Sequence, residues 1–134
     1  MKKVLILCTG NSCRSIMAEA VVNYTYPNEI QCYSSGVKAS GSVNENAIKA
    51  LMEFGIDTEG LHSKTLDTMM DIDYDLVVTV CDHANETCPL FPKGVQTLHV
   101  GIVDPTGKKF YEYLKTLNEI KTLVLPKIEE ALRN

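Results

Sequence analysis

The chain has 134 residues, of which 45% are hydrophobic and 22% are charged, and its net charge is −4. That length and composition are typical of one soluble globular domain, so we expect a single domain over residues 1–134. The 13 basic side chains are scattered and are outnumbered by 17 acidic ones. This distribution excludes a nucleic-acid or anionic-membrane surface as the main binding site.

The first residues are not expected to form a targeting segment. Two lysines precede an apolar run, residues 4–7, that is far too short for the core of a signal peptide. No run approaches the roughly 18 apolar residues of a membrane span. We therefore expect a cytoplasmic monomer without membrane contact. In a cytoplasmic chain, five cysteines indicate redox or metal chemistry rather than a structural disulfide framework.

The first predicted strand leads directly into a small polar loop. Residues 3–7 are apolar enough to predict a strand that is buried on both faces. The loop that follows reads Cys-Thr-Gly-Asn-Ser-Cys-Arg-Ser, and the apolar residues 16–24 predict a largely buried helix with Ser15 as its N-cap. Such a loop can direct backbone N–H groups at an anion beside the helix N-terminus.

The residue types in this loop suit nucleophilic chemistry. A cysteine surrounded by N–H donors is favoured as the thiolate, and Arg14 offers a planar fork of donors to a tetrahedral oxyanion. We predict that Cys8 attacks a phosphate-shaped substrate. The alternative is a small buried hydrophobe, which the strand–loop–helix context disfavours. The predicted anion-binding residues are Thr9, Gly10, Asn11, Ser12, Cys13, Arg14 and Ser15.

The rest of the chain alternates predicted strands with predicted helices. Further strands are expected at residues 30–34, 76–80 and 95–100. Asn44 opens a helix whose apolar stripe is Ala47, Ile48, Leu51, Met52 and Phe54, before Gly55 ends it. One or two helical turns are expected at residues 66–70, after a loop that holds His62. The last helix begins near Phe110, and Pro126 is expected to kink or split it.

This alternation predicts an α/β fold, a four-stranded parallel sheet with helices on both faces. Sites in such sheets gather beyond the carboxyl ends of the strands. Cys8, Cys81 and the loop of Asp104 all follow predicted strand ends, so we expect them at one edge of the sheet. Asp104 could act there as a general acid or base, or it could simply form a turn before Pro105.

We expect the polar segment 82–94 to be a loop. Cys81 stands directly before it, and Cys88 lies within it. Six residues separate Cys81 from Cys88, which is neither a CxxC motif nor zinc-finger spacing. A zinc site built with Cys8 and Cys13 is an alternative, but Arg14 beside the thiols speaks against it. A mobile loop with two thiols suits a disulfide relay.

Together the loop of residues 8–15, the Cys81–Cys88 pair and the Asp104-Pro105 dipeptide resemble the thioredoxin-coupled arsenate reductases. These enzymes share the fold of the low-molecular-weight protein tyrosine phosphatases, and the resemblance covers essentially the whole chain. It implies that Cys8 attacks arsenate held by the loop amides and Arg14, and that Asp104 protonates the departing oxygen. It also implies that Ser15 donates to the thiolate and that Asn11 braces the loop.

The resemblance further implies a three-cysteine relay in arsenic detoxification. Cys81 attacks the Cys8–arsenic adduct, arsenite leaves, and a Cys8–Cys81 disulfide remains. Cys88 then exchanges to give a Cys81–Cys88 disulfide, which thioredoxin reduces. The Cys13 and Cys32 thiols receive no role. The alternatives are a phosphomonoester phosphatase, disfavoured because Thr106 replaces the aromatic residue usual after Asp-Pro, and a thiol-based redox sensor.

Some reductases of this family also bind potassium near the loop through an asparagine, a glutamate, a serine and an aspartate. Asn11, Glu19 and Ser34 match the first three of these ligands. The fourth place falls at or near Thr65, which carries no carboxylate. We therefore expect no cofactor, with a potassium ion as the open alternative.

Overall fold

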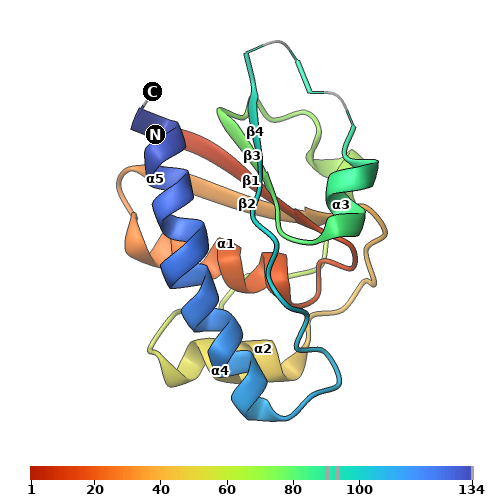
Figure 1. Cartoon of the computed structure of the whole chain (residues 1–134), viewed down its shortest axis with the longest axis vertical. Coiled ribbons are helices and arrows are strands. Elements are labelled where there is room, and N and C mark those ends of the chain that lie inside the picture. The colour runs from red at the N-terminus through yellow and green to blue at the C-terminus, as the bar shows by residue number, and fades with distance from the viewer. Residues whose placement is uncertain (90, 93, 134) are drawn as a thin grey trace.

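Four parallel strands form one sheet in the order β2-β1-β3-β4 (Figure 1). The computed structural model describes residues 1–89, 91–92 and 94–133. The strands are β1 (Lys2–Cys8), β2 (Ile30–Gly36), β3 (Leu76–Thr79) and β4 (Gln96–His99). In the central register, Val4 of β1 lies between Cys32 of β2 and Leu76 of β3.

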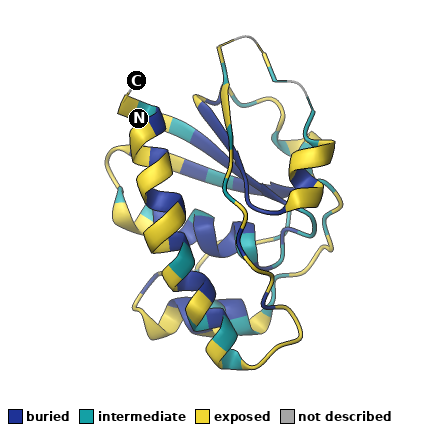
Figure 2. Ribbon diagram, in the orientation of Figure 1, coloured by how far each residue is buried: buried dark blue, intermediate teal, exposed yellow. Residues whose placement is uncertain are grey.

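The core is built on β1. Residues 4–7 of this strand are fully buried, and the neighbouring strand β3 is buried along its length (Figure 2). Because both faces of β1 are covered, its sequence is a continuous apolar run without polar alternation. The edge strand β4 is mostly exposed, which explains its weaker apolar pattern.

Helices connect and cover the strands. They are α1 (Arg14–Thr25), α2 (Glu45–Glu53), the 3₁₀ turn η1 (Leu66–Met69), α3 (Asp82–Thr87), α4 (Phe110–Glu119), the π-helical segment η2 (Ile120–Val124) and α5 (Leu125–Arg133). The β1–β2 and β3–β4 crossovers run in opposite directions along the sheet. Right-handed crossovers therefore place α1 and α3 on opposite faces, and the predicted α/β architecture is confirmed.

Two expectations about the site segments are wrong. The segment after β3 is not all loop, because α3 occupies its first part. Ser15 is not the N-cap of α1: the helix begins at Arg14, and Cys13 holds the N-cap position without a side-chain hydrogen bond. The Ser15 hydroxyl is instead within 2.8 Å of the Cys8 sulfur, so the serine serves the site rather than the helix end.

One of the helix expectations needs adjustment, and the expected interruption of the last helix near Pro126 is present. Asn44 does cap α2, because its side chain accepts from the N–H groups of Asn46 and Ala47. The predicted apolar stripe is too wide, however, since Met52 and Phe54 are exposed. Ahead of Pro126 the chain forms the π-helical turn η2, which accommodates a residue that cannot donate to the helix ladder. Over the described residues, no helix is both long and apolar enough to span a bilayer.

Candidate active site

The predicted site residues gather at the carboxyl ends of β1 and β3, the two central strands. Cys8 ends β1, and its loop continues into α1. Chain direction and parallel pairing bring Cys81, just past β3, to the same edge. The loop lies where the crossovers that leave β1 and β3 diverge, one to β2 and the other to β4, which is the usual ligand position in an open parallel sheet.

The backbone carbonyl groups of the loop point outward. Those of Cys8, Thr9, Gly10 and Ser12 accept hydrogen bonds at 2.8–3.1 Å from the N–H groups of residues 37, 38, 40 and 44. In a planar peptide unit the carbonyl and the following N–H point in opposite directions. The outward carbonyls therefore turn the following loop amides inward, toward the position an anion would take.

Two donors address the Cys8 sulfur. The N–H of Asn11 lies 3.2 Å from it, and the hydroxyl of Ser15 lies 2.8 Å from it. The Ser15 oxygen already accepts from the Asn11 side-chain amide at 2.7 Å, so its own proton is free to point at a thiolate. The Cys8 sulfur can therefore accept two hydrogen bonds.

Asn11 holds the loop in shape from within. It is fully buried, and its backbone adopts a left-handed φ of 47°, a conformation that asparagine tolerates better than most residues. Its side chain donates to Ser34 at 3.0 Å and accepts from the Lys64 N–H at 2.7 Å. The implied bracing role of Asn11 therefore has a geometric basis in both neighbouring segments.

Gly36, at the end of β2, lies directly against the loop. A Cβ atom there would lie 2.5 Å from the Thr9 carbonyl oxygen and 2.9 Å from the Asn11 nitrogen. Both neighbours are backbone atoms that cannot rotate away. The loop can therefore occupy its position only because residue 36 has no side chain.

Arg14 and Asp104 form one side of the site. The guanidinium donates to the Ile102 carbonyl at 3.2 Å and lies 3.6 Å from the Asp104 carboxylate. Burial raises the pKa of Asp104, but hydrogen bonds from Thr106 and the charges of Arg14 and Lys108 outweigh it, so the pKa lies below its usual range. The Thr106 N–H also bonds to Asp104 at 3.0 Å, so this aspartate both forms a turn and faces Arg14.

Cys81 is connected to the loop directly. Its sulfur lies 3.2 Å from the Thr9 hydroxyl. The same sulfur accepts from the Ala84 N–H at 3.4 Å, as the N-cap of α3. A second buried thiol thus stands beside the loop of the first, at the N-terminus of α3.

Cys88 lies at the other end of α3. Burial raises the pKa of its thiol, and the sulfur contacts the Pro89 carbonyl at 3.6 Å. It lines a cavity of about 390 Å³ between α3 and β4. Seven helical steps of about 1.5 Å separate its Cα from that of Cys81 by about 10 Å. A disulfide needs about 4.4–6.8 Å, so these thiols cannot pair while α3 is intact.

Three other candidates lie outside this arrangement. The Cys13 sulfur turns toward the Met17 sulfur, and burial together with the charge of Asp104 raises the pKa of the Cys13 thiol to about 12. Cys32 is buried in β2, where burial raises the pKa of its thiol well above the usual value. The ring of His62 contacts the Gly60 carbonyl. Only the Cys13 backbone belongs to the anion loop.

The zinc alternative finds no support in this geometry. Across residues 1–89, 91–92 and 94–133, no three His, Cys, Asp or Glu side chains are grouped as metal ligands.

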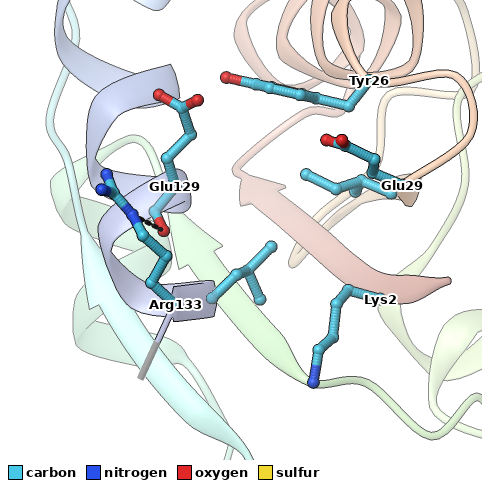
Figure 3. A pocket seen from close by; sticks show the side chains of 7 residues that line it. Lys2, Tyr26, Glu29, Glu129 and Arg133 are labelled. Atoms are coloured by element: carbon cyan, nitrogen blue, oxygen red, sulfur yellow. Dashed lines mark hydrogen bonds between the residues drawn. The ribbon is translucent and has the colours of Figure 1, made fainter.

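A separate cavity of about 430 Å³ lies at the amino end of β1 (Figure 3) and is lined in part by Lys2, Tyr26 and Glu129. Burial and the Glu129 carboxylate raise the pKa of Tyr26 there to about 12. That cavity lies at the end of β1 opposite to Cys8.

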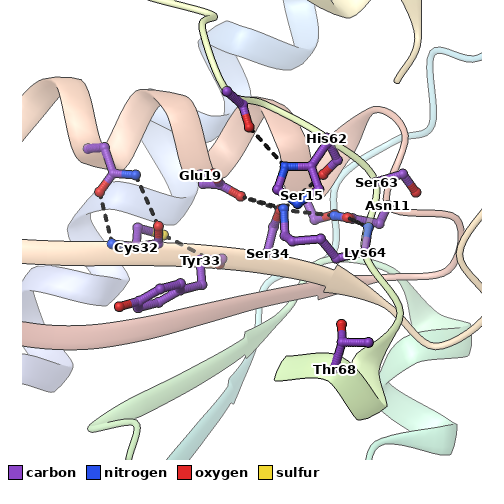
Figure 4. Close-up of polar contacts among 12 residues, drawn as sticks. Asn11, Ser15, Glu19, Cys32, Tyr33, Ser34, His62, Ser63, Lys64 and Thr68 are labelled. Carbon is purple, nitrogen blue, oxygen red and sulfur yellow. Dashed lines mark hydrogen bonds and ion pairs between the residues drawn. The ribbon is translucent and has the colours of Figure 1, made fainter. Parts of the chain in front are cut away.

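Sequence reasoning missed the support beneath the loop. Ser34 and Lys64 contact the loop or the residues that hold it (Figure 4). The sequence indicated Ser34 only as a potassium ligand and gave Lys64 no role. A polar serine in a strand that is otherwise buried was the one available signal. Nothing local to Lys64 distinguishes it from a surface lysine.

The fold and the loop define an anion cradle with a thiol at its base, mounted on a four-stranded parallel sheet. The chain belongs to the low-molecular-weight phosphotyrosine protein phosphatase family, and its similarity to that family extends over residues 3–133. Within that family the chain is 42% identical over 123 residues to arsenate reductase 2 of Staphylococcus epidermidis, a match that covers 92% of this chain and 93% of that protein.

Solved structures give the same picture. An arsenate reductase in the phosphate-binding state has a TM-score of 0.77 and 29% identity, with 91% of this chain and 92% of that one covered. A low-molecular-weight protein tyrosine phosphatase from T. tengcongensis has a TM-score of 0.81 and 28% identity, with 97% and 99% covered. The predicted fold and family resemblance are therefore confirmed.

Proposed function

We propose that this protein reduces arsenate to arsenite through Cys8, Cys81 and Cys88, and that thioredoxin regenerates it. The observation that carries the proposal is the contact between the Cys81 sulfur and Thr9 of the Cys8 loop. A phosphatase needs the cradle but has no use for a second thiol beside it. The curated relative at 42% identity is named as an arsenate reductase, which supports the same activity.

The first step is a displacement at arsenic. The Cys8 thiolate attacks arsenic(V), and an S–As bond forms as an As–O bond breaks. The inward amides and Arg14 bind the oxyanion, whose developing charge they stabilise. Asp104 supplies a proton to the departing oxygen, which leaves as water. The pKa of Asp104 is low in the substrate-free protein, so the carboxylate does not carry this proton before the substrate arrives. Asp104 takes up the proton as the anionic substrate approaches.

The second step transfers the electrons. The Cys81 thiolate attacks the Cys8 sulfur, a disulfide forms, and the electron pair of the S–As bond moves to arsenic. Arsenic(V) becomes arsenic(III) and leaves as arsenite. Two thiols are oxidised by two electrons, so the reaction needs no other reductant. Cys81 is well placed for this attack because Thr9 links its sulfur to the loop.

The third step moves the disulfide to the surface. Cys88 attacks Cys81, the Cys8 thiolate is released, and a Cys81–Cys88 disulfide results. Because α3 separates the two thiols, this helix has to unwind for the bond to form. An external dithiol of the thioredoxin type then reduces the exposed disulfide by the same exchange chemistry. A cytoplasmic monomer with reduced thiols is the form we propose.

The test is thioredoxin-coupled turnover with arsenate, measured for the wild type and for Cys8→Ser, Cys81→Ser and Cys88→Ser. We expect each substitution to abolish multiple turnover. In a single turnover without thioredoxin, Cys88→Ser should still release one equivalent of arsenite, because Cys8 and Cys81 supply both electrons. Full multiple turnover by Cys88→Ser would exclude the relay.

Hydrolysis of para-nitrophenyl phosphate separates the runner-up, a low-molecular-weight phosphatase. The cradle alone can support that reaction, so we expect only Cys8→Ser to abolish it. If the protein hydrolyses the aryl phosphate efficiently and releases no arsenite, it is a phosphatase. Stoichiometric zinc in freshly purified protein would favour the redox sensor instead.

A further inference from the structure

Lys64 places a positive charge beneath the Cys8 loop. Its ammonium lies 3.3 Å from Glu19 Oε1 and 3.4 Å from Ser34 Oγ, and it donates to the His62 carbonyl at 2.8 Å. The side chains of Lys64 and Glu19 are only 11% and 15% exposed. Burying an ammonium is costly unless all its protons are satisfied, and here three oxygens receive them (Figure 4).

This cation is connected to the nucleophile through a chain of hydrogen bonds with a fixed direction. Ser34 donates to Glu19, so its oxygen is left to accept from the Asn11 amide at 3.0 Å. The same amide donates to Ser15 at 2.7 Å, and Ser15 is then free to donate to the Cys8 sulfur. Lys64 also fixes Asn11 through its own backbone N–H.

The potassium alternative can be judged on these contacts. Glu19, Ser34 and Asn11 match three of the ligands expected from the resemblance. The oxygens of Glu19 and Ser34 already face the Lys64 ammonium, however, and a second cation among them would meet like-charge repulsion. The residues present therefore do not fit a bound potassium ion.

We propose that Lys64 is a tethered cation that orients the Glu19–Ser34–Asn11–Ser15 chain, so that Ser15 donates to the Cys8 thiolate without any free alkali ion. Lys64 is thus a positioning residue, since it touches neither the oxyanion nor the sulfur. The inference depends on Cys8 being the nucleophile of the proposed function, and it holds whether the oxyanion is arsenate or a phosphate ester.

The test follows the alkylation of Cys8 by iodoacetamide as a function of pH, with the modified cysteine located by mass spectrometry. Wild-type protein is compared with Lys64→Met in potassium chloride and in choline chloride of equal ionic strength. We expect identical wild-type profiles in both salts. In choline, Lys64→Met should react at neutral pH about tenfold more slowly, the scale of losing one favourable charge near a thiolate. Potassium should restore part of that rate.

Lys115→Met is the matched control, because it removes an exposed Lys–Glu pair on α4 and should leave the profile unchanged. Lys64→Arg keeps the charge and should recover part of the reactivity. If Lys64→Met does not fold, Glu19→Gln/Lys64→Met removes the uncompensated carboxylate, and its profile decides the question in the same way.

Two results would overturn the proposal: faster wild-type alkylation in potassium than in choline, or a Lys64→Met profile that superimposes on that of the wild type. Because alkylation requires no arsenate, these results stay separate from a failure of the proposed reductase activity.

Discussion

The Cys8 loop and α3 both follow a buried parallel strand at the same edge of the sheet, but they are held very differently. The loop carbonyls are bonded to neighbouring segments, and Asn11 at its centre is fully buried. In α3 only Ala84 is buried. Cavities of about 390 and 600 Å³ lie on either side of this helix. The first region is anchored by buried hydrogen bonds, whereas the second is a short helix with a single buried residue.

This difference matches the order of the proposed chemistry. Binding an oxyanion and stabilising charge at arsenic require donors that are fixed before the substrate arrives. Joining Cys81 to Cys88 requires a segment that opens at low cost, which short, exposed helices provide. One edge of the sheet therefore carries a firmly anchored site for the first thiol and a short, mostly exposed helix beside the last.

The largest expected effect comes from disturbing the rigid region. Gly36→Ala places a methyl group 2.5 Å from the Thr9 carbonyl oxygen, so the loop has to move. We expect activity to fall by about 10² or more, and overpacking to lower the free energy of unfolding by roughly 1–3 kcal/mol. Single-turnover arsenite release and chemical denaturation measure the two effects.

Gly55→Ala is the control for this prediction. Gly55 ends α2 with a positive φ of 72° and has no neighbour within 4 Å of an added Cβ. The substitution should cost about 1 kcal/mol of stability through backbone strain and leave turnover by the folded protein unchanged. Equal losses of activity in both variants would mean that a methyl group against the cradle disturbs activity no more than one at a distant glycine.

Asp104→Asn should have the next largest effect. Asparagine cannot give a proton to the departing oxygen, so the arsenate step should slow by about 10² while oxyanion binding is nearly intact. The pKa of Asp104 is lowered, and its protonated fraction falls as pH rises. The difference between wild type and variant should therefore shrink toward high pH. Rapid-quench measurement of arsenite against pH tests this, with exposed Asp67→Asn as the control. Unchanged kinetics would mean that Asp104 forms the turn and does not act as the acid.

The cradle could be predicted from the sequence because its signals are local. The apolar run before Cys8, the small loop residues and the apolar helix after Arg14 stand next to one another in the chain, and the structure has all three. The local pattern made Ser15 an N-cap, and only the family resemblance gave it the Cys8 sulfur as its partner, which is the contact in the structure. A capping serine and a serine that serves a neighbouring thiol have the same local sequence.

The rest depends on contacts that the sequence does not display. The segment of α3 has a single buried residue, Ala84, and so no helical periodicity could be read from it. Lys64 and Ser34 meet Asn11 only because β2 and the segment before η1 fold beneath the loop. Met52 and Phe54 continue an apolar stripe past the part of α2 that the core covers.

A matched pair of substitutions tests whether α3 has to unwind. Glu86 is exposed, so Glu86→Gly and Glu86→Ala change mainly helix propensity, by about 1 kcal/mol between them. If α3 has to unwind before Cys88 reacts, the glycine variant should form the Cys81–Cys88 disulfide about fivefold faster than the alanine variant. Acid quenching and peptide mapping after one turnover give both rates.

Arsenite release in the same experiment is the internal control, because it precedes the opening of α3 and should be equal in the two variants. Equal disulfide rates would contradict the unwinding requirement. A parallel change in arsenite release would show instead that α3 also affects the cradle, and the contrast between the two regions would fail.

The smallest effect is expected at a thiol that lies inside the rigid region and takes no part in the reaction. Cys13→Ala keeps the backbone amide of the loop and removes a sulfur that faces Met17, so turnover should stay within about twofold. Burial raises the pKa of the Cys13 thiol to about 12. At pH 7 only about one molecule in 10⁵ therefore carries the Cys13 thiolate. Alkylation of wild-type protein should reach Cys13 only at strongly alkaline pH. Modification of Cys13 at neutral pH would contradict this expectation.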